Sequence, residues 1–320
     1  MRHLRSIASA WNGFWFESDH REPMQAFRVC LSAILFFFYL SRTGDLELFY
    51  TEHGLLSADI AREIMPMDHR YSLFDWVPAA VQLPAVKIAH WGLLGALLAL
   101  AFGWAPRLAA IIAFALHLSF IHRNMMVMFG VDMIGTFFLF YFCLADGRRE
   151  VPARPDFRSM LGSVAFRLAQ IQVCIIYAYS GLEKIKGPLW WNGEALWSVL
   201  ANSQLARFDF SWIASFPIVI VLATYSTLLW EIYFPALVWA RPLRPWMLSF
   251  GVALHLGIAI AINIWWFGFL MIATYLLFVE PRSLEKFLRR VGPWLTRISS
   301  RGILHTTPQV SPARSDKTFV

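Results

Sequence analysis

The stretch that decides the fold runs from residue 170 to residue 193 and reads QIQVCIIYAYSGLEKIKGPLWWNG. It begins as an apolar helix and ends with two lysines, a Gly-Pro turn and a Trp-Trp pair. Gln170, Tyr177 and Lys184 recur every seven residues, so they share one face of that helix. Because a polar stripe is costly against lipid, we expect this face to meet protein or a cavity.

The composition places the whole chain in a membrane. Of its 320 residues, 58% are hydrophobic and only 15% are charged, whereas soluble domains average about half and about a quarter. The net charge of +7 would suit a nucleic-acid binder. The basic residues, however, lie in the predicted loops and the C-terminal tail, where they orient a chain in a bilayer. We therefore expect a lipid bilayer, and no nucleic acid, as the partner.

Long apolar runs predict an all-α, polytopic helical membrane protein with about eight transmembrane helices. This domain covers residues 24–282 and follows an interfacial N-terminal segment, 1–23, that is rich in Trp, Phe and Arg. A basic cytoplasmic tail is expected at 283–320, disordered from about residue 299. The expected spans are residues 24–40, 83–102, 107–121, 125–144, 164–182, 212–239, 246–262 and 265–279.

The distribution of basic residues predicts the orientation. On this topology, 18 Lys and Arg residues fall on one side of the membrane and 7 on the other. An excess of basic residues marks the cytoplasmic side. We therefore expect a multi-pass protein of the bacterial inner membrane with both termini in the cytoplasm. Lys184 then lies at the outer face.

Ionisable residues inside the predicted spans need a reason, because each costs about 3 kcal/mol at the bilayer centre on insertion scales. By predicted depth, His117, His122, Asp132 and Lys184 converge near the outer face, with His255 below them. No set of His, Cys, Asp and Glu residues shows metal-ligand spacing, so we expect no metal site.

Structural roles explain the same residues equally well. Asp132 can pair with Arg123 or another cation between helices. His117 and His255 can be core histidines bonded to a neighbouring carbonyl group. Glu231 can pair with a basic residue at the inner boundary of the membrane.

Lys184 also has two interpretations. A lysine at a helix end commonly extends its ammonium group to the membrane interface and does nothing more. Alternatively, Tyr177 and its apolar neighbours shield the amine, and loss of hydration favours the neutral form, which can act as a general base. Glu183 favours the charged form and Lys186 disfavours it, so the sequence leaves both open.

Four stretches, in this order, carry a family resemblance. They are Ile176-Tyr177 with Ser180-Gly181-Leu182, Lys184, Gly187, Trp191 and Gly193 to Leu196; His122-Arg123-Asn124 with Gly130 and Asp132; Glu231 with Phe234-Pro235 and Trp239; and Gly251, His255, Asn263 and Leu276-Leu277-Phe278. Together they resemble the HTTM domain, the membrane domain shared by vitamin K-dependent gamma-carboxylase and many bacterial proteins. The resemblance covers roughly residues 20–282.

The resemblance implies a role for Lys184. In the carboxylase, the matching lysine is the base that deprotonates the reduced quinone. Met125 follows Asn124 where the carboxylase has a histidine, so glutamyl carboxylation is not expected here. The leading hypothesis is a membrane-embedded enzyme whose outward-facing pocket binds a reduced quinone or another lipid-phase substrate.

In this hypothesis the candidate residues have distinct roles. Lys184 is the base, and Tyr177 orients it by a hydrogen bond. His122 and Asp132 complete a polar wall around the reacting group. The quinone itself is expected to contact His117, His255 and Trp191.

Two other classes of function remain. A non-catalytic membrane protein that binds a partner would use the same polar residues only to fix helix packing. A transporter would be expected to show paired half-helices or an internal repeat. The sequence displays neither, so transport ranks last.

Overall fold

Helices make up the fold throughout the part of the chain that the computed structural model describes, which is residues 2–16, 21–64, 71–145, 156–281, 283, 284 and 286. The long helices are α1 (Arg2–Phe16), α2 (Arg21–Leu40), α5 (Gln82–Phe102), α6 (Pro106–Arg123), α7 (Gly130–Leu144), α8 (Phe157–Ile185), α11 (Pro217–Leu237), α12 (Arg244–Ala261) and α13 (Trp265–Thr274). Shorter helices are α3 (Leu46–Tyr50), α4 (Ala58–Ile64), α9 (Pro188–Trp191) and α10 (Ala195–Leu200), with 3-10 turns including η3 (Leu73–Trp76), η5 (Met125–Val127), η6 (Ser211–Ser215) and η7 (Tyr275–Phe278).

The predicted class, an all-α membrane protein, is confirmed. Each of the eight expected spans overlaps a helix. Five stretches are long and apolar enough to cross a membrane: the one that ends with α2, the one that ends with α5, and α8, α11 and α12. Helix α7 and the α13–η7 pair are apolar but shorter, so the count of eight is not confirmed.

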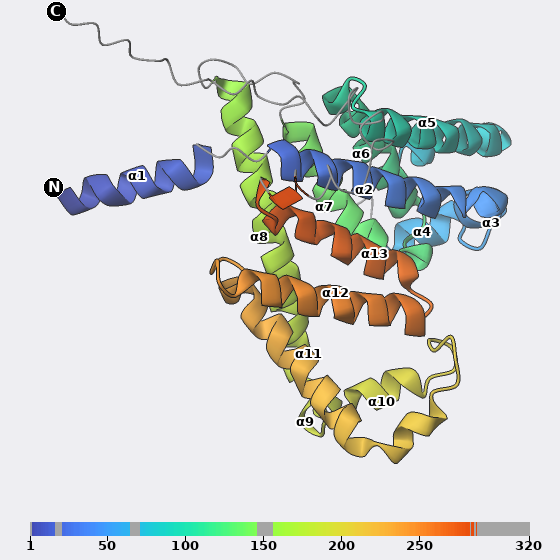
Figure 1. Ribbon diagram of the computed structural model, residues 1–320. Helices are drawn as coiled ribbons and strands as arrows, with labels where there is room; N and C mark the ends of the chain where they lie inside the picture. Colours follow the sequence, from blue (N-terminus) through green and yellow to red (C-terminus); the bar gives the residue numbers. More distant parts are fainter. Residues whose placement is uncertain are drawn as a thin grey trace, which may run out of the picture.

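The helices pack in two connected groups. In the first, α6 packs between α5 and α7, and α2 packs against both α5 and α13. In the second, α8 and α11 form the pair, with α9 and α10 against α11. Figure 1 shows α8 running across the direction of α2, α12 and α13, and reaching with α11 into a separate lower lobe. Helix α12 joins the groups through contacts with α13 and α11.

Contacts between distant segments show that α6 and α7 run in opposite directions, as do α2 and α5. The Arg107 side chain at the start of α6 donates to the Cys143 carbonyl near the end of α7, at 2.9 Å. At the opposite end, the Thr43 hydroxyl after α2 lies 3.0 Å from His90 Nε2 in α5. The arrangement agrees with the predicted alternation, without showing which end faces the cytoplasm.

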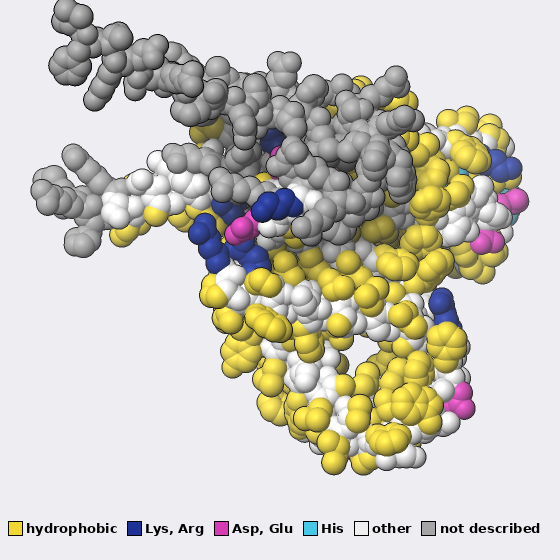
Figure 2. Space-filling view, viewed as in Figure 1, with side chains coloured by type: hydrophobic (Ala, Val, Ile, Leu, Met, Phe, Trp, Pro, Cys, Tyr) yellow, Lys and Arg dark blue, Asp and Glu magenta, His cyan; other side chains and the backbone are white. Residues whose placement is uncertain are grey.

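Helix α2 shows how the core is built. Phe27, Leu31 and Leu35 are spaced four residues apart on one face, and all three are fully buried. The Phe27 ring meets the Phe138 ring of α7 edge-on at 4.7 Å. Large apolar side chains on the outer faces are exposed instead, for example Trp246 at 76%, and Figure 2 shows such side chains over much of the visible surface. An apolar exterior of this kind suits lipid.

Two glycines allow close packing against α11 and η7. A Cβ at Gly181 would lie 2.9 Å from Ile232 Cγ1 and 3.2 Å from the Ile232 backbone nitrogen. Glycine therefore lets α8 approach the α11 backbone directly. A Cβ at Gly251 would collide with the Tyr275 ring and lie 2.7 Å from Trp230 Cζ2, so α12 needs glycine there to accommodate two aromatic rings.

We expect Gly251→Ala to lower the free energy of unfolding by about 1–3 kcal/mol, because the added methyl group must displace Tyr275 and Trp230. Gly257→Ala in the same helix is the matched control, since a Cβ there meets no atom within 4 Å. Thermal unfolding of the detergent-purified protein, followed by tryptophan fluorescence, measures both. Equal stability of the two variants would contradict the packing described.

Candidate functional site

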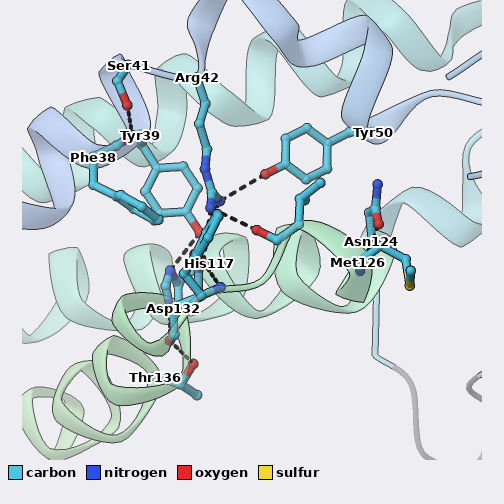
Figure 3. A network of polar contacts seen from close by, with 12 residues as sticks. Phe38, Tyr39, Ser41, Arg42, Tyr50, His117, Asn124, Met126, Asp132 and Thr136 are labelled. Atoms are coloured by element: carbon cyan, nitrogen blue, oxygen red, sulfur yellow. Dashed lines mark hydrogen bonds and ion pairs between the residues drawn. The ribbon is translucent and has the colours of Figure 1, made fainter. Parts of the chain in front are cut away.

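The polar residues singled out in the sequence fall into two networks. One joins α2, α6 and α7 around Asp132 and is drawn in Figure 3. The other joins α8, α11 and α12 around Lys184 and Tyr177. Within the described residues, no hydrogen bond or ion pair joins Asp132 or His117 to Lys184. The two networks therefore share no direct polar contact through these residues, and the expected convergence near the outer face stays a prediction.

Asp132 lies in the first turn of α7 and pairs with Arg42, which follows α2. Arg42 Nη2 lies 3.1 Å from Asp132 Oδ2, and Arg42 Nη1 lies 3.3 Å from Oδ1. The Phe129 N–H donates to Asp132 Oδ2 at 2.9 Å, so the carboxylate also caps its own helix. The expectation of an interhelical ion pair is confirmed, with Arg42 as the cation instead of Arg123.

Tyr50 completes the surroundings of Arg42. Its hydroxyl accepts a hydrogen bond from Arg42 Nη1 at 3.2 Å. Burial raises the pKa of Tyr50 to about 12, and the Asp132 charge acts in the same direction while Arg42 opposes it. Tyr50 therefore stays neutral near physiological pH, and the guanidinium and the carboxylate are the charges of this network.

Both ring nitrogens of His117 form hydrogen bonds. Its Nε2 lies 2.9 Å from the Asp132 carbonyl oxygen, and its Nδ1 lies 2.8 Å from the Tyr39 hydroxyl. Because a carbonyl only accepts, the proton is on Nε2, and Nδ1 accepts from Tyr39. The interpretation of His117 as a core histidine is confirmed, and no ring nitrogen is left for a cofactor.

The His-Arg-Asn run holds the 41–81 connection onto the bundle. Arg123 is fully buried and donates to the carbonyl groups of Thr51 and Leu56 at 2.9 and 3.0 Å. Asn124 donates to the Phe49 carbonyl at 2.8 Å. His122 Nδ1 accepts from the Tyr71 N–H at 3.0 Å. These contacts place His122 at the interface between α6 and the loop before α5, and its role in a polar wall stays a prediction.

Lys184, in the last turn of α8, lies beside the C-terminal half of α11. Its Nζ lies 2.8 Å from Glu231 Oε2 and 2.6 Å from the Ser180 hydroxyl. The side chains of Lys184 and Glu231 are 23% and 9% exposed. Glu231 lies within two turns of the C-terminal end of α11. Its expected pairing with a basic residue is confirmed, with Lys184 as that residue, whereas the depth of Lys184 in the membrane stays a prediction. The close approach at Gly181 brings the two helices into this register.

Tyr177 does not orient Lys184 as expected. Its hydroxyl lies 2.8 Å from His255 Nε2 and 2.6 Å from the Tyr275 hydroxyl. His255 Nδ1 is buried and has no hydrogen-bond partner in the described part of the chain. A buried ring nitrogen without a partner is unusual and calls for a ligand or a water. The Lys184 charge lies within electrostatic range of His255.

Of the two adjacent tryptophans, the ring nearer Lys184 belongs to Trp190. Lys184 Nζ lies 5.2 Å from the centre of the Trp190 ring, within cation–π range. Trp191 is 58% exposed and donates its indole N–H to the Ile185 carbonyl at 2.6 Å. Trp191 therefore caps the end of α8, and its predicted contact with a cofactor has no support in this geometry.

Several partners were missed in the sequence, and they differ in how visible they were. Ser180 lies one turn before Lys184, so helical spacing alone would have suggested it. Tyr275 lies in η7, far along the chain from Tyr177, and only its position in an apolar segment marked it. Glu231 was expected to pair with a basic residue, but the sequence did not identify Lys184 as that residue. For metals, no group of three or more His, Cys, Asp or Glu side chains stands close enough to share an ion within the described ranges.

Comparison with known proteins gives a family and one relative. The family model of the HTTM domain matches residues 50–282. The chain is 22% identical over 211 residues to "Uncharacterized protein YitO" of Bacillus subtilis (strain 168), a match that covers 61% of this chain and 68% of that protein. No solved structure matches.

We expect Asp132→Ala to destabilise the protein by about 3–5 kcal/mol, because it leaves the Arg42 charge buried without its partner. The double change Arg42→Met with Asp132→Leu should recover much of this loss, since neither charge remains. Asp59→Ala is the control: its pair with Arg62 is on the surface and should be worth no more than about 1 kcal/mol. Similar losses for Asp132→Ala and Asp59→Ala in thermal unfolding would refute the buried pair.

Proposed function

This chain belongs to the HTTM domain family, and from that premise we propose that it is a membrane-embedded enzyme acting on a reduced quinone or another lipid-phase substrate. The site lies between α8, α11 and α12, with Lys184 as the base. The observation that carries the proposal is the half-buried pair of Lys184 and Glu231, 2.8 Å apart inside apolar helices. Ionisable groups at such depth are costly and usually serve a function.

Glu231 can accept the proton of the Lys184 ammonium group, so that a lysine held in an ion pair can still act as a base. Transfer of the ammonium proton from Lys184 Nζ to Glu231 Oε2 leaves a neutral amine and a neutral carboxylic acid. Apolar surroundings reduce the cost of that exchange, because they disfavour both charges. The amine then accepts the proton of a substrate hydroxyl, while Glu231 holds the proton that Lys184 gave up.

The residues around the pair fit a substrate with polar oxygens on an apolar body. His255 Nδ1 is buried and without a partner among the described residues, so it offers a second polar contact. The Tyr177 hydroxyl bonds to His255 Nε2 and to the Tyr275 hydroxyl, and these two hydrogen bonds fix the His255 ring. A reduced quinone, when bound, supplies an acidic hydroxyl and two electrons. His255 and Lys184 would orient it, and the surrounding apolar helices would exclude water.

The test is mass spectrometry of an organic extract of the protein purified in mild detergent. We expect a quinone at near one per chain, lost on Lys184→Ala. Lys186→Ala is the matched control, because Lys186 is two residues away and pairs with Glu183 at the surface. Quinone that is absent, or equally retained by Lys184→Ala, would overturn the assignment.

A second candidate function is that of a non-catalytic membrane protein. It is favoured by the observation that Lys184 is already neutralised by Glu231. On this account, Lys184→Ala lowers stability without affecting any bound molecule. The double change Lys184→Met with Glu231→Leu would then restore the thermal midpoint, because no buried charge remains.

A further inference from the structure

Three arginines gather where the end of α1, the α8 helix and the turn between α11 and α12 meet. Arg167 comes from α8, and Arg241 and Arg244 come from the turn and the first residue of α12. Glu280, after η7, supplies one acid, with its Oε1 3.9 Å from Arg244 Nη1. We call these four residues the basic corner. Figure 2 shows Lys and Arg side chains collected at this end of the molecule, beside the base of α1.

Helix α1 is attached to the basic corner. The Arg167 Nε–H donates to the Phe14 carbonyl at 2.8 Å, and the guanidinium group lies 4.4 Å from the centre of the Phe14 ring. The Phe14 ring in turn lies 5.9 Å from the Trp239 ring at the end of α11. The indole N–H of the neighbouring Trp15 is buried and has no hydrogen-bond partner in the described ranges.

The positive charges of the basic corner are not balanced. Arg167 and Arg244 lie close enough for their charges to interact unfavourably. Arg167 Nη1 donates to the neutral amide of Gln170 at 2.8 Å. Arg241 is exposed and makes no hydrogen bond or ion pair among the residues that the structure describes. Within the part of the chain that the structure describes, Glu280 is the one acid that forms an ion pair with any of these three arginines.

The Arg244 side chain also donates hydrogen bonds to two backbone carbonyl groups. Its Nε donates to the Val238 carbonyl at 3.0 Å and its Nη2 to the Trp239 carbonyl at 3.4 Å. These bonds satisfy carbonyl groups at the end of α11 that have no helical partner. Arg244 therefore has a structural role, whereas Arg241 is free to meet a ligand.

We propose that the basic corner binds the phosphate of an anionic membrane lipid. Guanidinium groups match phosphate oxygens with paired hydrogen bonds. On α1, Ile7 and Trp11 are exposed at 66% and 61%, which suits a helix lying at the lipid interface. The proposal uses none of the residues around Lys184, so it stands or fails independently of the proposed enzyme.

Native mass spectrometry of the full-length protein in detergent tests the proposal by titration with phosphatidylglycerol or phosphatidylcholine. We expect phosphatidylglycerol to bind about tenfold more tightly, as one or two charged hydrogen bonds allow. Arg241→Ala should remove most of this preference without unfolding the protein, since the exposed Arg241 side chain forms no hydrogen bond or ion pair with the described residues. Arg207→Ala is the control, an exposed arginine in the loop that pairs with the end of α12.

Two results would overturn the proposal. One is equal binding of the two lipids, or a preference for phosphatidylglycerol that survives Arg241→Glu. The other is displacement of phosphatidylglycerol by inorganic phosphate at the same concentration, which would make free phosphate the ligand. Loss of the preference in Arg241→Ala together with its retention in Arg207→Ala supports the lipid site.

Discussion

The cost of placing charge inside an apolar helical bundle is the constraint on which this structure depends. Two ion pairs between distant segments, Arg42 with Asp132 and Lys184 with Glu231, satisfy it by direct contact. They differ in their surroundings. The Asp132 carboxylate is almost fully buried and is bonded by Arg42 and a backbone N–H. Lys184 keeps part of its side chain exposed, so the second pair is the one that a ligand can reach.

Two glycines allow the helices to approach closely enough for the polar residues of the site to meet. Gly181 lets α8 lie against the α11 backbone, and that contact sets Lys184 opposite Glu231. Gly251 makes room for Tyr275, whose hydroxyl meets Tyr177. The same helices that carry the polar chain therefore also carry the glycines that allow it to form. His255 ends this chain with a buried nitrogen for which the described residues offer no partner.

Hydrophobicity was sufficient to predict a helix within each of the eight expected spans, because the apolar runs are long and their ends carry turn residues and charges. It did not establish how many of these helices cross the membrane, since α7 and the α13–η7 pair are shorter. The partner of each charge was not predictable in the same way. Lys184 ends its own apolar run, and nothing in that run identifies Glu231 as its partner, because the register between α8 and α11 depends on Gly181, which spacing along one helix does not reveal. Likewise, the sequence predicts that Asp132 pairs with a cation. It does not identify Arg42, which is 90 residues away, because helical periodicity relates only residues of one helix.

Infrared difference spectroscopy of the detergent-purified protein, recorded as a short-chain naphthohydroquinone is added, would test the central claim most directly. The account predicts that binding produces the signal of a protonated carboxylic acid, as Glu231 takes the proton from Lys184. The signal should vanish in Glu231→Gln and persist in Glu183→Gln, whose carboxylate pairs with Lys186 at the surface. A spectrum without this signal, or one unchanged in Glu231→Gln, would contradict the claim that the pair holds and moves a proton.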